Sequence, residues 1–159
     1  MDTYQGLSAG LTARLALEKN EFHFTHTLGQ NFILDDGLME RIVDEAGVAP
    51  GDRVLEIGAG AGVLTRHLID RGAAVTAVEV DASLRPVLGA VLGDRPVKLV
   101  FEDIMKADLH ALMGDDPYDV VANLPYYMTA DVILKLLTDQ AAPRRVTVMV
   151  ILTVIGVRR

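Results

Sequence analysis

The sequence predicts a doubly wound α/β fold built on a parallel sheet. Short, β-branched apolar runs alternate with amphipathic segments of helical length, and glycine or polar residues follow directly after the apolar runs. Strands at the centre of a parallel sheet are short and mostly apolar, because helices cover both of their faces. The expected strands are residues 53–57, 74–79, 97–101, 118–122 and 146–151.

Helices are expected between these strands and before the first of them. Their predicted ranges are residues 8–19, 37–47, 62–71, 82–92 and 129–138. Asp35 and Asp36 precede the second helix and Asp81 precedes the fourth, where a carboxylate can accept hydrogen bonds from the free N–H groups of the first turn. Right-handed crossovers would place a ligand at the carboxyl ends of the strands. We assign residues 1–20 to an N-terminal helical segment and residues 21–159 to the main domain.

Composition narrows the class of protein. With 159 residues, half of them apolar, the chain has the size of one domain with a single core. It has no cysteine, which excludes disulfides and thiolate metal sites. No apolar run approaches the roughly 20 residues of a membrane helix, and the N-terminus lacks a signal pattern, so we expect a cytoplasmic protein without a membrane partner. The net charge of -7 opposes nucleic-acid binding unless cations cluster locally.

A glycine-rich loop follows the first expected strand in "LEIGAGAGVLT", residues 55–65. Glycines such as Gly58 and Gly60 let the backbone approach a ligand closely. The alternative is a tight strand-to-helix turn that binds nothing. Val63 stands where a dinucleotide-binding loop has its third glycine, which favours a different nucleoside cofactor over a nicotinamide dinucleotide.

Acidic residues follow the next two strands. Glu79 lies 21 residues beyond Gly58 and can accept hydrogen bonds from both hydroxyls of a ribose. After the third strand, Asp103 can accept a hydrogen bond from an adenine amino group, and Ile104 can pack on the ring. Glu56 precedes the glycine loop, and we expect it to hold the amides of the loop, or a water near them, without touching the ligand.

The fourth strand leads into "NLPYY", residues 123–127. The amino group of adenine is a poor nucleophile because its lone pair is delocalised into the ring. The side-chain carbonyl of Asn123 and the backbone carbonyl of Leu124 can accept both amino hydrogens and direct the lone pair at an electrophile. Pro125 fixes the direction of that carbonyl, and Tyr126 offers a face on which a base can stack.

Five motifs together resemble one family. They are "LGQNFILD" (28–35), "EIGAGAG" (56–62), "VEVD" (78–81), "EDI" (102–104) and "NLPYY" (123–127). In order and spacing they resemble the ribosomal RNA adenine N6,N6-dimethyltransferases. The resemblance implies a Rossmann-like class I methyltransferase sheet and S-adenosyl-L-methionine as the cofactor. It also implies that Asn31 and Ile33 line the cofactor pocket and that Gly58, Glu79, Asp103 and Asn123 contact the cofactor or lie between it and the base.

The same resemblance implies a substrate and a partner. In the family, two methyl groups are placed on each of two adjacent adenines in a hairpin loop of small-subunit ribosomal RNA. We expect no metal site, because His23 and His26 lie in an apparent loop without a third ligand. Two alternatives remain open: a fragment that binds S-adenosylmethionine without efficient catalysis, and a macrolide-resistance enzyme that modifies large-subunit RNA.

The end of the chain departs from the family. The family continues past "VTVMV" into further strands and a small helical domain, whereas this chain reads "ILTVIGVRR" and ends. We therefore expect a sheet whose last strands are missing, with an exposed edge and an apolar segment over residues 146–157. Such an edge favours self-association.

Overall fold

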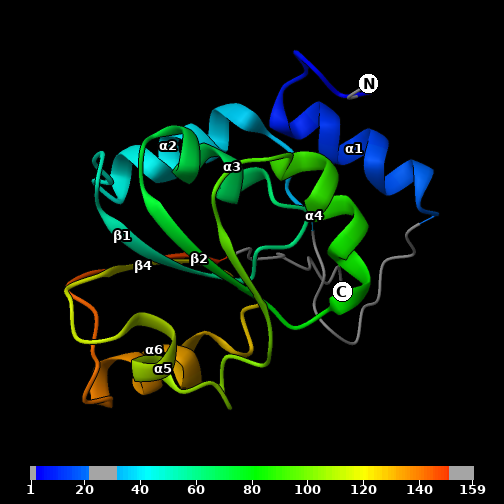
Figure 1. Cartoon of the computed structure of the whole chain (residues 1–159). Helices are drawn as coiled ribbons and strands as arrows, with labels where there is room; N and C mark the ends of the chain where they lie inside the picture. The colour runs from blue at the N-terminus through cyan, green and yellow to red at the C-terminus, as the bar shows by residue number, and fades with distance from the viewer. Residues whose placement is uncertain (1–2, 22–31, 151–159) are drawn as a thin grey trace, which may run out of the picture.

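The fold is a five-stranded parallel sheet with helices on both faces (Figure 1). The computed structural model describes residues 3–21 and 32–150. The strands are β1 (Arg53–Ile57), β2 (Ala74–Glu79), β3 (Lys98–Phe101), β4 (Asp119–Leu124) and β5 (Val146–Val150), in the spatial order β3-β2-β1-β4-β5. All four neighbouring pairs are parallel, which confirms the predicted doubly wound fold. The order reverses between β1 and β4, where ligands bind in such sheets.

Helices form a layer on each side of the sheet. One layer holds α1 (Ala9–Lys19), α2 (Asp36–Glu45), α3 (Val63–Asp70) and α4 (Arg85–Leu92), and the other holds α5 (Leu109–Met113) and α6 (Thr129–Thr138) (Figure 1). Because side chains alternate along β1, Val54 packs in the core beneath the first layer, whereas Leu55 and Ile57 pack beneath the second. The sheet is therefore buried on both faces.

The elements differ from the sequence prediction in three places. The helix expected over residues 82–92 begins as a 3₁₀ turn, η2 (Ala82–Leu84), before α4. The helix α5 was not predicted, because five residues are too few to show a helical period. The strand β4 runs two residues further than expected, which places Asn123 inside the strand and not after it.

Two of the three predicted caps are confirmed. Asp35 accepts a hydrogen bond from the Leu38 N–H at 3.1 Å, and Asp81 accepts one from the Ser83 N–H at 3.0 Å. The prediction for Asp36 was wrong, because it is the first residue of α2 and its carboxylate faces α1 and α3 instead. Charge at a helix start can serve a tertiary contact as well as a cap.

An ion cluster around one buried carboxylate holds the amino-terminal ends of β4 and β5. The Asp119 side chain is 2% exposed and accepts hydrogen bonds from Arg144 at 3.0 Å and from Arg145 at 2.8 Å. Burial raises the pKa of the Asp119 carboxyl, but the two arginines outweigh burial and hold the pKa below its ordinary value. The cluster therefore keeps a buried carboxylate charged at the edge of the sheet opposite to the candidate site.

Within residues 3–21 and 32–150, no helix combines the length and apolar character needed to cross a bilayer.

Candidate functional site

The register of the sheet places three of the predicted site residues at one level. Ile57 of β1 pairs with Val78 of β2 on one side and with Ala122 of β4 on the other. The next residue along each strand is Gly58, Glu79 or Asn123, so these three lie side by side at the carboxyl edge. This is the switch point of the sheet, where a crevice for a ligand forms.

Gly58 permits a close contact between the glycine loop and β4. Its φ is 82°, in the left-handed region, and a Cβ added there would stand 2.5 Å from the Asn123 backbone oxygen. Any other residue would strain the backbone and collide with β4. The loop and the Asn123 backbone are thus in direct contact.

The Glu79 carboxylate shapes the glycine loop. Its Oε2 accepts a hydrogen bond from the Gly60 N–H at 2.8 Å, and its Oε1 accepts one from the Asp81 N–H at 3.1 Å. The side chain is nearly buried, and burial raises the pKa of Glu79 although both N–H groups act in the opposite direction. Glu79 therefore fixes the loop geometry from below, whatever ligand the crevice binds.

Glu56 lies beneath the same loop, fully buried. The Thr65 hydroxyl donates to its Oε1, and Oε2 has no hydrogen-bond partner among the described residues. The pKa of Glu56 is raised to about 8. Burial is the main cause, the nearby Glu79 charge adds to the rise, and the Thr65 hydrogen bond partly offsets it. Glu56 was expected to hold the loop amides or a water near them; the Gly60 amide is held by Glu79 instead, and the water stays a prediction. Burial thus favours the protonated form of Glu56.

The loop after β3 brings Asp103 to the same edge. Asp103 Oδ1 accepts a hydrogen bond from the Met105 N–H at 2.9 Å, which turns the chain back on itself. Ile104 is 4% exposed and packs in the core of the second layer. The Lys135 ammonium of α6 donates to the Ala107 carbonyl at 2.9 Å and ties this loop to the helix that follows "NLPYY".

The "NLPYY" segment presents polar and aromatic groups at the end of β4. Asn123 is half-buried, and within the described residues its carboxamide makes no hydrogen bond. The Pro125 carbonyl accepts hydrogen bonds from the Met128 N–H and the Thr129 hydroxyl, both at 3.1 Å, which fixes the turn into α6. Leu124 is buried, whereas Tyr126 is 71% exposed. The rings of Tyr126 and Tyr127 meet edge-on, with 5.8 Å between their centroids. Among the described residues, the segment therefore offers an amide without a hydrogen-bond partner close to an accessible ring.

The structure adds apolar residues to this edge that the sequence analysis did not select. Val80 and Met105 are 52% and 40% exposed, and each lies one or two residues beyond the strand-end acids Glu79 and Asp103. An apolar residue shortly after an acid at a strand end is the signal that could have identified them. Phe32 is a third addition, because its ring lies against Gly60.

Some predicted residues are not placed at the site. Asn31, His23 and His26 lie outside the described residues. Ile33 is described, half-buried, and packs against the core of the first layer. Across residues 3–21 and 32–150, no group of three His, Cys, Asp or Glu side chains could hold a metal ion.

Comparisons with known proteins cover most of the chain. Residues 21–157 match the family described as ribosomal RNA adenine dimethylase. The ribosomal RNA small subunit methyltransferase A of Alkaliphilus oremlandii is 40% identical over 139 residues, which are 84% of this chain and 48% of that protein. The chain thus spans about half the length of the curated relatives that it matches.

Solved structures share the fold. The 23S rRNA methyltransferase ErmE is similar with a TM-score of 0.64 and 31% identity, over 76% of this chain and 48% of that chain. A dimethyladenosine transferase from Plasmodium falciparum is similar with a TM-score of 0.60 and 24% identity, over 73% of this chain and 42% of that one. These similarities confirm the predicted class of sheet.

Proposed function

The chain belongs to the ribosomal RNA adenine dimethylase family, and we propose that it forms the cofactor and methyl-transfer site of an enzyme that methylates N6 of adenine in ribosomal RNA. Membership confirms the resemblance predicted from the five motifs. The observation that carries the proposal is the alignment of Gly58, Glu79 and Asn123 at one level of the sheet edge. That alignment supports a nucleoside site at Gly58 and Glu79 next to an amide, Asn123, that suits an adenine amino group.

The residues present suit S-adenosyl-L-methionine. Gly58, Gly60 and Gly62 all have positive φ, and the tight turn that they form from β1 into α3 supports a backbone loop against which the methionine part of the cofactor can lie. Glu79 offers carboxylate oxygens for the ribose, and Asp103 for the adenine amino group. Val80, which is 52% exposed, supplies apolar surface for the adenine ring, and the buried Ile104 backs the loop that carries Asp103. When bound, the cofactor supplies an electrophilic methyl group on a sulfonium.

Asn123 and its neighbours would prepare the target nitrogen. The Asn123 side-chain carbonyl and the Leu124 backbone carbonyl accept the two amino hydrogens, which directs the nitrogen lone pair toward the cofactor crevice. Pro125 holds the Leu124 carbonyl in place, and Tyr126 stacks on the base. No general base is needed before transfer, because the nitrogen becomes acidic on alkylation and can release its proton to water.

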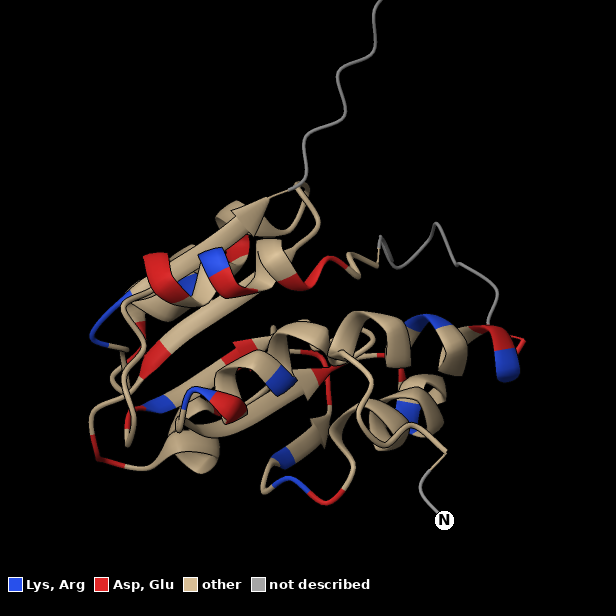
Figure 2. Ribbon diagram, turned by 90° about the horizontal axis from the view of Figure 1, so that it is seen from above, with Lys and Arg blue, Asp and Glu red and all other residues tan. Residues whose placement is uncertain are grey.

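The substrate we propose is small-subunit ribosomal RNA, because the curated relatives carry that name. In the described part of the chain, Lys and Arg lie on several separate elements of the ribbon (Figure 2), and the net charge of the sequence is -7. Phosphate neutralisation supplies most non-specific RNA affinity, so these residues contribute little of it. We therefore propose that this chain binds the cofactor well and RNA weakly. We also propose that it acts in the cytoplasm and that it self-associates through the exposed edge of β5.

A calorimetric titration with S-adenosylmethionine tests the cofactor assignment. Glu79→Ala should weaken binding by about 1 to 3 kcal/mol, the loss of hydrogen bonds in a partly buried pocket. The matched control is Glu102→Ala, an exposed acid on the next strand end, which should bind like the wild type. Equal affinity of Glu79→Ala and wild type, or stronger binding of NAD, would refute the assignment.

A methyl-transfer assay then separates chemistry from binding. Asn123→Ala should lower transfer to a small-subunit RNA hairpin by ~100-fold and change cofactor affinity by less than about threefold, because its carbonyl acts on the target nitrogen. The similarity to ErmE makes large-subunit RNA the second substrate to assay. Transfer to large-subunit RNA alone would favour the macrolide-resistance activity, and cofactor binding with no transfer to either would favour a binding fragment.

A further inference from the structure

The helix α1 makes a very close backbone contact with the segment that leads into α2. Gly10, in the first turn of α1, lies against the Leu34 carbonyl, where an added Cβ would stand 2.0 Å from the Leu34 oxygen and 2.7 Å from Asp36 Oδ2. Real Cβ atoms do not approach backbone so closely, so only glycine fits. α1 is thus docked directly on the segment of residues 32–36.

Asp36 joins α1 to two other helices. Its two carboxylate oxygens accept the Gly10 N–H at 3.2 and 3.1 Å, and Oδ1 lies 2.6 Å from His67 Nε2 of α3. The side chains of Asp36 and His67 are 30% and 18% exposed. Arg66 of α3 adds a second tie by donating to the Leu7 carbonyl at 2.9 Å, just before α1. The start of α1 is therefore held by α2 and α3 together.

The same segment reaches the glycine loop. The Phe32 ring lies 3.5 Å from the position of a Cβ built on Gly60, and the Gly60 N–H donates to Glu79 at 2.8 Å. Phe32 covers the outside of the loop while Glu79 holds it from below. Only Ile33 separates Phe32 from Leu34, which Gly10 contacts, so the position of α1 is transmitted over two residues.

We propose that Gly10 and Asp36 are positioning residues for the cofactor loop, because the docking of α1 on residues 32–36 keeps Phe32 against Gly60 and the loop in its binding shape. The inference rests on the function proposed above. Its three glycines give the loop a high conformational entropy when no contact orders it. A loop that is already ordered before the cofactor binds loses less conformational entropy on binding. The helix α1 lies before residues 21–157, the part that matches the family.

Two substitutions of glycine by alanine provide the test. Gly10→Ala introduces the collision with Leu34, whereas Gly89→Ala, in α4, adds a Cβ that meets nothing within 4 Å. The first measurement needs no ligand: hydrogen exchange of the amides of residues 58–62. We expect exchange about tenfold faster in Gly10→Ala and unchanged in Gly89→Ala, since exchange reports local opening.

The second measurement is calorimetric titration with S-adenosylmethionine. We expect about tenfold weaker binding in Gly10→Ala, a raised KM for the cofactor and an unchanged kcat, because the loop and not the reacting amide is disturbed. A lower melting temperature with unchanged exchange and unchanged affinity would overturn the proposal and leave α1 a purely stabilising helix. If Gly10→Ala does not fold, the isosteric Asp36→Asn decides by the same two measurements.

The two inferences fail separately. A wild-type chain that does not bind S-adenosylmethionine refutes the proposed function, and the positioning role falls with it. A wild type that binds, with Gly10→Ala and Asp36→Asn indistinguishable from it in exchange and affinity, refutes only the positioning role.

Discussion

Replacing Glu56 by glutamine should change how the stability of the fold depends on pH. Glu56 is fully buried, and its pKa is raised from an ordinary 4.5 to about 8. Between these values the folded chain keeps the proton and the unfolded chain releases it. The free energy of unfolding therefore falls as pH rises through this window and levels off above about 8. Glutamine has the same shape and no proton to lose, so Glu56→Gln lacks this dependence.

The size of the effect follows from the pKa difference. At about 1.4 kcal/mol for each pH unit, the full difference corresponds to about 5 kcal/mol. Structural relaxation and water entry relieve part of the cost of a buried charge, so we expect about 2 to 4 kcal/mol. Relative to the wild type, Glu56→Gln should gain this much stability between about pH 5 and pH 8.

Urea denaturation followed by circular dichroism measures this difference, since the chain has no tryptophan. The free energies of unfolding of wild type and Glu56→Gln are compared at about pH 5 and at about pH 8. Taking the difference between the two proteins at each pH cancels the titration of the groups that they share. The matched control is Glu40→Gln, which makes the same chemical change at an exposed position of α2 and should follow the wild type at both pH values. A stability difference between wild type and Glu56→Gln that is equal at both pH values would show that Glu56 is charged in the folded protein.

Three further predictions concern the loop, the ion cluster and the edge of the sheet. Gly58→Ala should lower stability by about 1 to 3 kcal/mol in thermal denaturation, because of its left-handed φ and the 2.5 Å contact with Asn123; an unchanged melting temperature would contradict the close contact. Above about pH 4, Asp119→Asn should be less stable than the wild type. The wild type loses this extra stability as pH falls through the lowered pKa of Asp119, so the free energies of unfolding of the two proteins should converge at low pH. A stability difference that is the same at every pH would exclude this role. Val150→Lys should reduce self-association in sedimentation experiments, and a wild type that is monomeric at all concentrations would rule out association through this edge.

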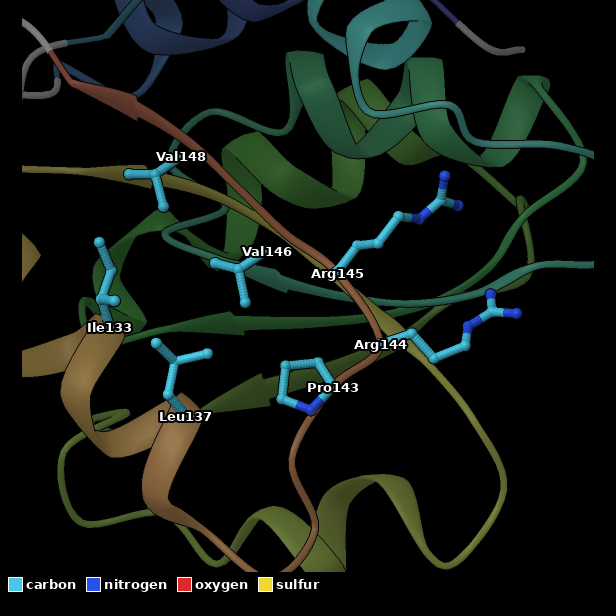
Figure 3. A pocket seen from close by; sticks show the side chains of 7 residues that line it. All are labelled: Ile133, Leu137, Pro143, Arg144, Arg145, Val146 and Val148. Carbon is cyan, nitrogen blue, oxygen red and sulfur yellow. The ribbon is translucent and has the colours of Figure 1, made fainter.

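The depression beside β5 is separate from the candidate site. It has a volume of about 430 Å³ and lies between α6 and β5, lined by Ile133, Leu137 and Val148 among others (Figure 3). Leu137, which lines it, is 63% exposed, and Leu134 of the same helix is 62% exposed. Val146 and Val148, from the described part of the apolar segment predicted over residues 146–157, line this depression.

The elements whose signal is local could be predicted from the sequence. The apolar runs indicated all five strands, because buried parallel strands differ in composition from everything around them. The strand-end position of Gly58, Glu79 and Asn123 followed from the same pattern. The roles of Glu56 and Asp36 could not be predicted, since each depends on partners distant in sequence or in another layer: Thr65 for one, and Gly10 with His67 for the other. A carboxylate looks the same in a sequence whether it caps a helix, holds a loop or lies protonated in a core.

The place of β4 between β1 and β5 sets the order in which the chain can fold during synthesis. β1 has one neighbouring strand until residues 119–124 emerge, and the carbonyl that supports Gly58 arrives with them. The Asp119 carboxylate then needs Arg144 and Arg145, which are 25 and 26 residues further along. Pairing between distant segments forms late, and burying an unpaired carboxylate is costly, so β4 and β5 should join the sheet together. A nascent chain that ends before Arg144 would expose β1 and Asp119 to chaperones and to other nascent chains.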